Sequence, residues 1–264
     1  MTDVHDELTL QEKETLFGSQ LNQQFPVLWP CLEQVIQGAG RVFAGCPPLP
    51  VHEISDSELA SRTLMARLIT DLYAVCILAW KGYLAQTVAL TSSTLETAYL
   101  LTYIGLNDKT ARQWLDHPDA TQQIVSVFNL IQGSLSHLDH PTGGLWTPQE
   151  LEEHTKSEYH IYQQMCGVKH LNAAMQMPLG LELRPGEGRI TVGPQFSETF
   201  FNVTLWTLYH AARMALQATD AFARGHAPVT ALAQFKNSLP ATERLMADLL
   251  GYLDRPLAPS VAEE

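Results

Sequence analysis

The segment 83–104 constrains the fold more than any other, because its apolar residues cover nearly the whole circumference of the helix that it predicts. Such a helix has no water-facing side and must be surrounded by other elements. Its only charged residue is Glu96. A buried carboxylate is costly unless it is paired or hydrogen-bonded. We therefore expect a central helix whose acid contacts a tyrosine hydroxyl, a histidine or Arg67 of the preceding helix.

Helical patterns dominate the rest of the chain. Ser55 and Glu58 have the spacing of a capping box and predict a helix that runs to Trp80 and stops at Gly82. The run Thr147-Pro148-x-Glu150 predicts the start of another helix, which continues to about Met175. Further helices are expected over 10–21, 27–42, 107–117, 119–135, 195–223 and 229–253.

A change of pattern follows the helix that ends near Met175. Residues 181–183 and 189–192 alternate apolar and polar side chains around a Pro-Gly turn, which predicts a small β-hairpin near 181–192. The predicted fold is all-α, an up-and-down bundle of about eight helices with this hairpin inserted. We expect N-terminal helices and a Pro-rich loop over 1–54, the main bundle over 55–255 and a frayed tail over 256–264.

The charge balance limits the class of partner. The 264 residues carry a net charge of −12, which disfavours nonspecific binding to nucleic acid or to an anionic membrane surface. The N-terminus is acidic where a secretory signal would be basic, and the most apolar run, 73–80, is too short to span a bilayer. The four cysteines form no C-x-x-C pair. These features predict a cytoplasmic protein with free thiols.

Two helical motifs resemble a known family. The run from Cys76 to Glu96, followed by 98–104, and the later Tyr162-x-x-x-Cys166-x-x-x-His170 are similar to a family of uncharacterised bacterial all-helical proteins. That family has a Leu-Leu-Arg-Ser-x-x-Glu helix and a Tyr-x-x-x-Ser-x-x-x-His helix, and it is loosely similar to abortive-infection and HEPN-type proteins. The likeness covers roughly 62–223. It implies a functional Arg–Glu pair, but Ser92 occupies the arginine position here.

The candidate binding residues are Glu96, Tyr162 and His170. A perturbed carboxylate near a histidine is typical of a ligand pocket, and the resemblance places these three residues on its motifs. The alternative is a buried polar network that fixes the register of the helices. On this alternative His170 and His210 are core histidines with satisfied ring nitrogens.

A ribonuclease of the HEPN type would need Arg-x(4 to 6)-His, and Arg112 and His117 have this spacing. In that chemistry the arginine would position a phosphate and the histidine would act as acid or base. Ten arginines and ten histidines in 264 residues predict about one such match by accident. A cationic end of a short helix also favours the helix dipole, which explains the pair without catalysis.

No cofactor or metal site is expected. His137 and His140 lie in an expected loop, and His154 with Glu158 lacks a third ligand at recognisable spacing. Gly-rich phosphate loops and nucleophile elbows are absent from the sequence. Catalysis is left undecided. The favoured hypothesis is a binding or interaction protein, linked by resemblance to stress or phage defence, with a protein or small-molecule partner.

Two alternatives stay open beside this hypothesis. The first is an HEPN-like endoribonuclease or toxin. The second is a small-molecule sensor or enzyme with a polar pocket inside the bundle. A homodimer is left open as the assembly.

Overall fold

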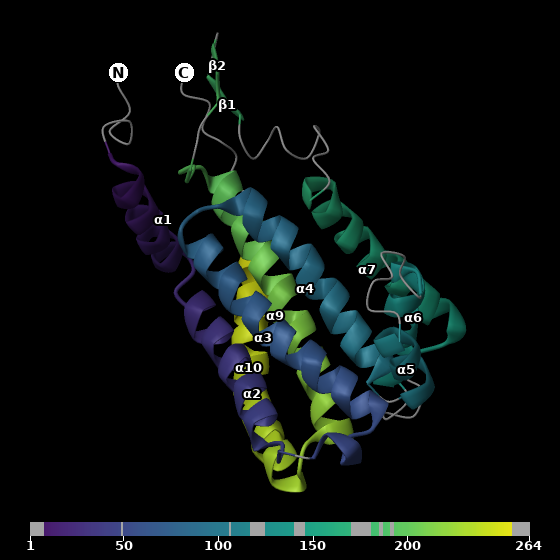
Figure 1. The fold of residues 1–264 in the computed structure, drawn as a ribbon. Helices are drawn as coiled ribbons and strands as arrows, with labels where there is room; N and C mark the ends of the chain where they lie inside the picture. The colour runs from purple at the N-terminus through teal and green to yellow at the C-terminus, as the bar shows by residue number, and fades with distance from the viewer. Residues whose placement is uncertain are drawn as a thin grey trace.

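The computed structural model describes residues 8–48, 50–105, 107–116, 125–139, 146–169, 181–184, 187–190 and 193–254. Nine α-helices lie in this part of the chain, and they confirm the all-α class (Figure 1). The helices are α1 (Leu10–Gln24), α2 (Leu28–Gly45), α3 (Asp56–Trp80), α4 (Leu84–Ile104), α5 (Asp108–Asp116), α6 (Val127–Asp139), α7 (Pro148–Lys169), α9 (Glu198–His226) and α10 (Val229–Leu253).

The helix starts follow local hydrogen-bond chemistry. At α7 the hydroxyl of Thr147 accepts from the backbone N–H of Glu150, and the Glu150 carboxylate accepts from the backbone N–H of Thr147. At α3 the hydroxyl of Ser55 accepts from the N–H of Glu58, but the Glu58 carboxylate binds Arg62 instead. Only half of the capping box predicted at Ser55 is therefore formed.

One predicted helix start is wrong. Asp119 was expected to begin a helix that runs to residue 135, but α6 begins at Val127, where the hydroxyl of Ser126 accepts from the N–H of Asn129. Asp119 itself lies outside the described residues. Because Ser126 is not helical, the predicted helix cannot be continuous across it.

The turn between α3 and α4 has the geometry that its glycine predicts. Gly82 has a φ of +76°, the left-handed conformation that favours glycine. The N–H of Tyr83 donates to the carbonyl of Leu78 and that of Gly82 to the carbonyl of Ala79, which is a Schellman motif. The predicted stop after Trp80 is confirmed, and the chain reverses so that α4 packs along α3.

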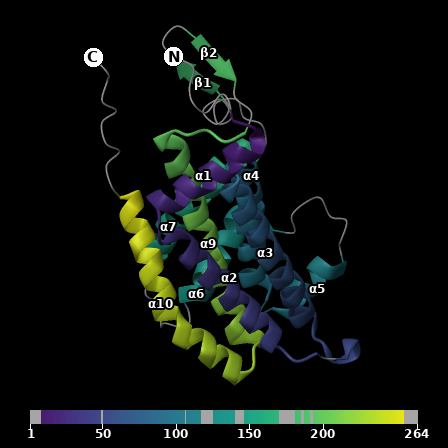
Figure 2. The ribbon, with the colours of Figure 1, turned by 90° about the vertical axis from the view of Figure 1, so that its left-hand side faces the viewer.

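Two helices occupy the centre of the molecule. The prediction for 83–104 is confirmed, because Gln86 is the only exposed residue of α4. Helix α9 is enclosed at least as well: none of the residues 200–223 is exposed, and it packs against α2, α3, α4 and α10. Figure 2 shows α9 in the middle with α10 on one side and α3 on the other. Helix α7 packs on α4 and α6.

Helix α1 is held at the α3–α4 turn. The Glu14 carboxylate accepts hydrogen bonds from Lys81 Nζ at 2.5 Å and from the Tyr83 hydroxyl at 2.6 Å. Gly18 brings α1 so close to α3 that an added Cβ would lie 2.4 Å from the Trp80 ring. A glycine is therefore needed at this crossing.

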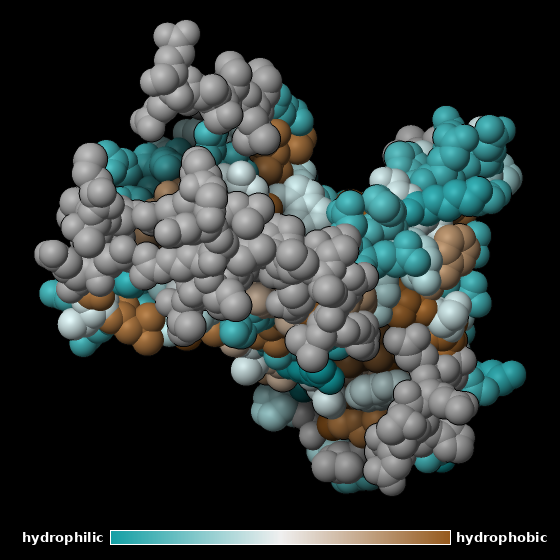
Figure 3. Space-filling view, turned by 90° about the horizontal axis from the view of Figure 1, so that it is seen from above, coloured by the Kyte–Doolittle hydropathy of each residue, from teal (hydrophilic) through white to brown (hydrophobic). Residues whose placement is uncertain are grey.

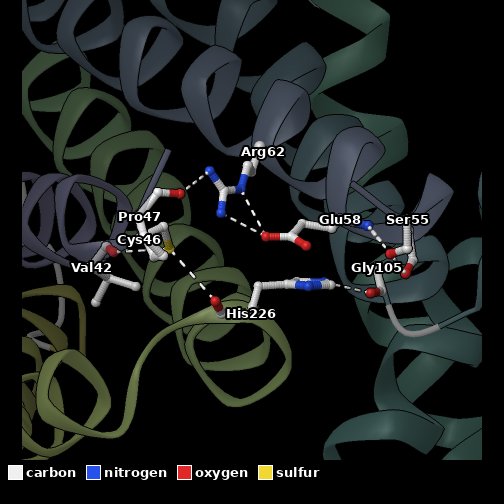
Figure 4. A network of polar contacts seen from close by, with 9 residues as sticks. Val42, Cys46, Pro47, Ser55, Glu58, Arg62, Gly105 and His226 are labelled. Carbon is white, nitrogen blue, oxygen red and sulfur yellow. Dashed lines mark hydrogen bonds and ion pairs between the residues drawn. The ribbon is translucent and has the colours of Figure 1, made fainter. Parts of the chain in front are cut away.

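A polar network joins four chain segments at the opposite end of the bundle (Figure 4). His226, at the end of α9, donates from Nε2 to the carbonyl of Gly105 at 2.6 Å, which requires the tautomer protonated on Nε2 because a carbonyl only accepts. Arg62 donates to the carbonyl of Pro47 at 2.8 Å and pairs with Glu58. The Cys46 thiol donates to the carbonyl of His226 at 3.7 Å, so the loops after α2, α4 and α9 are tied to one another and to α3.

Two short strands follow α7 in sequence. β1 (Leu181–Arg184) and β2 (Glu187–Ile190) pair antiparallel, with Leu181 opposite Ile190 and Arg184 opposite Glu187. Residues 185, 186, 191 and 192 of the predicted hairpin lie outside the described residues.

Among the described residues, α3 alone has the length and apolar composition that would let a helix cross a membrane. The core helix of a soluble protein meets the same two criteria, so this is weak evidence for a membrane location. The run 73–80, which by itself is too short to span a bilayer, forms the C-terminal part of α3.

Candidate functional site

The half-exposed residues of α9 lie along one side of the helix. Their spacing of three or four residues places them on a single face, and no other residue of this helix between 200 and 223 is open to solvent. In the C-terminal half of α9, most of the side chains on this face are polar. We call four of them the α9 polar stripe: His210, Arg213, Gln217 and Asp220.

Arg213 connects the stripe to helix α7. Its NH2 donates to Oε2 of Glu158 at 2.5 Å, and the same carboxylate oxygen accepts from the Tyr99 hydroxyl of α4 at 3.0 Å. Glu158 and Arg213 expose 13% and 24% of their side chains, so this ion pair is largely removed from water. Three helices that are distant in sequence therefore meet at one carboxylate.

The protonation of this cluster follows from its partners. Burial alone would raise the pKa of Glu158, but the charge of Arg213 and the hydrogen bonds from Arg213 and Tyr99 together hold that pKa below its usual value. Burial and the neighbouring Glu158 raise the pKa of Tyr99. At neutral pH the cluster is therefore a carboxylate, a guanidinium and a neutral phenol.

A second acid–tyrosine contact lies beside the first. The Tyr162 hydroxyl of α7 donates to Oε1 of Glu96 on α4 at 2.7 Å, and Lys169 Nζ lies 3.3 Å from the same oxygen. Burial and hydrogen bonds with Cys166 and Glu96 raise the pKa of Tyr162. The Glu96 side chain is 28% exposed, so it is half-buried rather than fully enclosed.

The two contacts form a crossed pair along the α4–α7 seam. Helix α4 supplies Glu96 and Tyr99, one turn apart, and α7 supplies Tyr162 and Glu158, also one turn apart. Each acid is completed by a cation, Lys169 for the first and Arg213 for the second. Every carboxylate in this seam is thus hydrogen-bonded and charge-paired.

His210 is the most enclosed member of the stripe, with 8% of its surface exposed. Its ring lies 4.7 Å from the Trp206 ring and 5.3 Å from the Tyr209 ring, centroid to centroid, with edge-on geometry. Burial, aided by the charge of Arg213, lowers the pKa of His210 to about 4. The imidazole is therefore neutral at pH 7 and offers one donor and one acceptor.

Each member of the stripe has one buried polar atom without a hydrogen-bond partner in the described part of the chain. These atoms are Nδ1 of His210, Nε of Arg213, Oε1 of Gln217 and Oδ1 of Asp220. Buried polar atoms in proteins nearly always have partners. Four of the seven such atoms in the described part of the chain lie on this one helix face.

Seen from above, a notch separates the right-hand lobe, where α6 and α7 lie in Figure 1, from the rest of the surface (Figure 3). Helices α7 and α10 flank α9, since α7 reaches it through Glu158 and α10 packs on it directly.

Only some of the residues predicted from the sequence lie at this site. The structure brings Glu96 and Tyr162 together, while Arg67 pairs with Asp71 instead of Glu96. His170 lies outside the described residues. The expectation that His210 is a satisfied core histidine is wrong for Nδ1, although the ring is buried as expected.

Arg213 and Glu158 were not recognised as partners from the sequence. Glu158 was considered only as a metal ligand with His154, but its carboxylate binds Arg213 and Tyr99, and the His154 ring lies against Trp146. A signal was present: a helix apolar on most sides carries polar residues at 210, 213, 217 and 220, which share one face.

The described residues do not form the ribonuclease pair or the metal sites that were considered from the sequence. Arg112 is 69% exposed and faces Asp56 and Asp116, and His117 lies outside the described residues. The structure describes neither His140 nor the His137 side chain. Within the described ranges, no three His, Cys, Asp or Glu side chains come together as metal ligands.

The chain matches no family model, no curated protein and no solved structure.

Proposed function

We propose that this chain is a bacterial cytoplasmic binding protein that holds a small polar molecule on the half-open face of α9, beside the α4–α7 seam. The observation that carries the proposal is the α9 polar stripe, whose four members each leave a buried polar atom without a partner. The resemblance of 62–223 to a family of bacterial helical proteins, itself loosely similar to abortive-infection proteins, supports an accessory role in stress or phage response.

The free-energy cost of leaving these four atoms without hydrogen bonds favours the binding of a ligand. A buried donor or acceptor without a partner costs about 1–3 kcal/mol, and a ligand that provides the partner recovers that cost on binding. Arg213, Gln217 and Asp220 are half-exposed although their unpartnered atoms are buried, so a rotation of these side chains, without unfolding of the bundle, would bring the atoms to a ligand.

The state of the ionisable groups favours binding over catalysis. Glu158 and Glu96 are both engaged in ion pairs and tyrosine hydrogen bonds. Burial raises the pKa of Cys31 and of Cys76 to about 12, which keeps these thiols protonated and unreactive. The site resembles a rigid recognition surface more than a set of poised acids and bases.

The proposal is tested by thermal unfolding with a panel of polar small molecules that covers nucleobases, amino acids, sugars and carboxylates. A binding compound raises the melting temperature of the wild-type protein. The increase should be lost in Gln217→Leu and kept in the control Gln37→Leu, whose side chain is exposed on α2 and pairs with Glu33. If no class stabilises the wild-type protein, the proposal fails.

The endoribonuclease hypothesis is tested separately by incubating the protein with total RNA. Its variants are Arg112→Ala, His117→Ala and His170→Ala. Cleavage by the wild-type protein that is abolished in any one of them would replace the binding proposal. The exposure of Arg112 and its two acidic neighbours favour the result that RNA stays intact.

A further inference from the structure

We infer that the solvent-facing side of α3 binds a second copy of this chain, with the two α3 helices packed side by side and antiparallel. This surface shares no residue with the α9 polar stripe, so the dimer and the ligand proposal stand or fall separately. Three features of α3 carry the inference: the spacing of its exposed residues, their sizes, and the charges along the edges of the face.

The solvent side of α3 has a heptad pattern. Seven residues recur at alternating intervals of four and three, and we call them the α3 seam: Leu59, Thr63, Ala66, Thr70, Tyr73, Ile77 and Trp80. All of them are exposed except Ala66, which is half-exposed. A repeat of 3.5 residues is the period at which two helices pack against each other along their whole length as a coiled coil.

The seam is largely apolar and open to water in the single chain. Tyr73 and Ile77 expose 55% and 56% of their surfaces, and only 33% of the most apolar 18-residue stretch of α3 is buried. Figures 1 and 2 both place α3 on the outside of the bundle. The hydroxyls of Thr63 and Thr70 each donate to the carbonyl four residues earlier at 2.9 Å. A second helix can therefore cover the seam without leaving these hydroxyls unpaired.

Side-chain size makes the seam complementary to itself. Its last three residues are large, whereas the three before them are small. In a parallel pair each large residue would lie on its own copy and each small residue on its own copy, which leaves gaps in the packing. An antiparallel pair instead places every large residue on a small one, in three layers: Tyr73 on Thr70, Ile77 on Ala66, and Trp80 on Thr63 of the second copy.

The edges of the seam favour the same orientation. Arg67 and Asp71 lie along one edge, and Arg62, Ile69 and Cys76 lie along the other. Antiparallel helices meet along like edges, so Arg67 of each copy faces the edge that carries Asp71 of the other. Parallel helices meet along unlike edges, which would bring Arg67 to the edge that carries Arg62. The antiparallel pair thus matches opposite charges where the parallel pair would bring like charges together.

The charge of the chain favours a protein partner over a lipid surface. A net charge of −12 disfavours an anionic bilayer, whereas the seam itself holds no charged residue. Repulsion between two acidic copies is long-range and is screened beyond about 8 Å at physiological ionic strength. We therefore expect the dimer to become stronger as the salt concentration rises.

Sedimentation velocity of the full chain, from micromolar to submillimolar concentration, tests the dimer. We expect the wild-type protein to dimerise, and Ile77→Glu should raise the dissociation constant at least about tenfold because each copy would bury an unpaired carboxylate. The matched control is Leu250→Glu on α10, which also replaces an exposed apolar side chain and should leave the dissociation constant unchanged. Circular dichroism shows whether each variant keeps its helical content.

Thiol cross-linking tests the orientation with two matched variants, Thr70→Cys and Thr63→Cys. Both threonines are exposed and make the same hydrogen bond. In the antiparallel pair the two copies of residue 70 lie close to the twofold axis, whereas the two copies of residue 63 are about 25 Å apart along the helices. A short bis-maleimide should therefore link only Thr70→Cys into dimers above the background that the four native cysteines give in the wild-type protein.

Several results would overturn the inference. A wild-type protein that stays monomeric at every concentration removes it, and co-sedimentation of that monomer with phosphatidylcholine vesicles would identify the seam as a membrane-binding face instead. A dimer that Ile77→Glu leaves intact forms through another surface. Cross-linking at both positions, or at neither, contradicts the antiparallel arrangement.

Discussion

The positive charge of Arg213 is largely buried, and Glu158 is the acid that compensates it. The guanidinium comes from α9 and the carboxylate from α7, and both side chains are largely buried. Removing one partner of such a pair leaves an uncompensated charge away from water, whereas removing both charges can be nearly neutral. The pair is therefore expected to hold α7 in place more through the penalty of breaking it than through its net attraction.

We predict that Arg213→Met destabilises the protein by about 3 kcal/mol, because Glu158 is left without its cation. Adding Glu158→Gln to that variant should restore at least about 1 kcal/mol. Urea unfolding of the two single variants and the double variant gives the coupling energy. Simple additivity of the two changes would contradict this account of the pair.

His210 makes the stability of the protein depend on pH. Its pKa is about 4 in the folded protein and 6.5 when solvated, so between these values the unfolded chain takes up a proton that the folded chain does not. Stability must therefore fall as the pH is lowered from 6.5 toward 4. At pH 5 this residue contributes a loss of about 2 kcal/mol relative to pH 7.

Urea unfolding at pH 7 and pH 5 tests this dependence. His210→Leu should lower the difference in stability between the two pH values by about 2 kcal/mol, because leucine does not titrate. His52→Leu, at a position 81% exposed, is the matched control and should leave the difference unchanged. An unaltered pH dependence in His210→Leu would show that the ring is protonated in the folded state.

The need for a partner was predictable from the sequence, but the partner itself was not. Glu96 is the only charge on an otherwise apolar helix and was expected to contact a tyrosine hydroxyl, a histidine or Arg67; Tyr162 provides the hydroxyl, and Lys169 is a second partner that was not expected. Glu158 and Arg213 could not be paired from the sequence, since 55 residues separate them and each lies on a helix with several charged residues. Spacing within a helix says nothing about which helix lies opposite.

At the level of elements, the crossing of α1 and α3 depends on the absence of a side chain at Gly18. We predict that Gly18→Ala destabilises the protein by about 1–3 kcal/mol, because its Cβ would lie within 3 Å of the Trp80 ring and force the helices apart. The melting temperature measures the loss.

The matched control is Gly40→Ala in α2, where an added Cβ meets nothing within 4 Å. Alanine favours a helix interior by about 1 kcal/mol over glycine, so this variant should be more stable than the wild type. Opposite signs for two glycine-to-alanine changes in helices would identify the close crossing as the cause. Equal effects would contradict it.

Element boundaries were predictable where a backbone signal is strong. Helix α10 has the predicted bounds, 229–253, even though Pro240 lies inside it. The start of α6 was misplaced because Asp119 and Ser126 are both residues that favour N-caps, and the sequence pattern does not rank them. The helix beginning at Pro148 is described as far as Lys169, and its predicted continuation to Met175 lies outside the described residues.

For the whole molecule, the network around His226 ties the loops at one end of the bundle. We predict that His226→Ala lowers stability by about 1–3 kcal/mol, because the Gly105 carbonyl loses its donor. His226→Gln keeps an N–H donor and should lose less. Hydrogen exchange should increase at the α4–α5 junction in the alanine variant, and protection equal to the wild type would contradict the assignment.

The arrangement of helices was predicted only in outline. The all-round apolar pattern of 83–104 identified one central helix, because such a pattern has a single physical solution. Helix α9 shares the centre with it, and its half-open face is set by how α4, α7 and α10 surround it. These contacts join segments distant in the chain, so local periodicity does not determine them.

The central place of α9 has a consequence for synthesis on the ribosome. Its partners α2, α3 and α4 are translated well before residue 198. Their apolar surfaces therefore stay uncovered until α9 has been synthesised. At about 5–20 residues per second, the first 197 residues take roughly 10–40 seconds to emerge. During that interval the nascent chain exposes an incomplete core, and it should depend on chaperones that shield such surfaces until α9 is released.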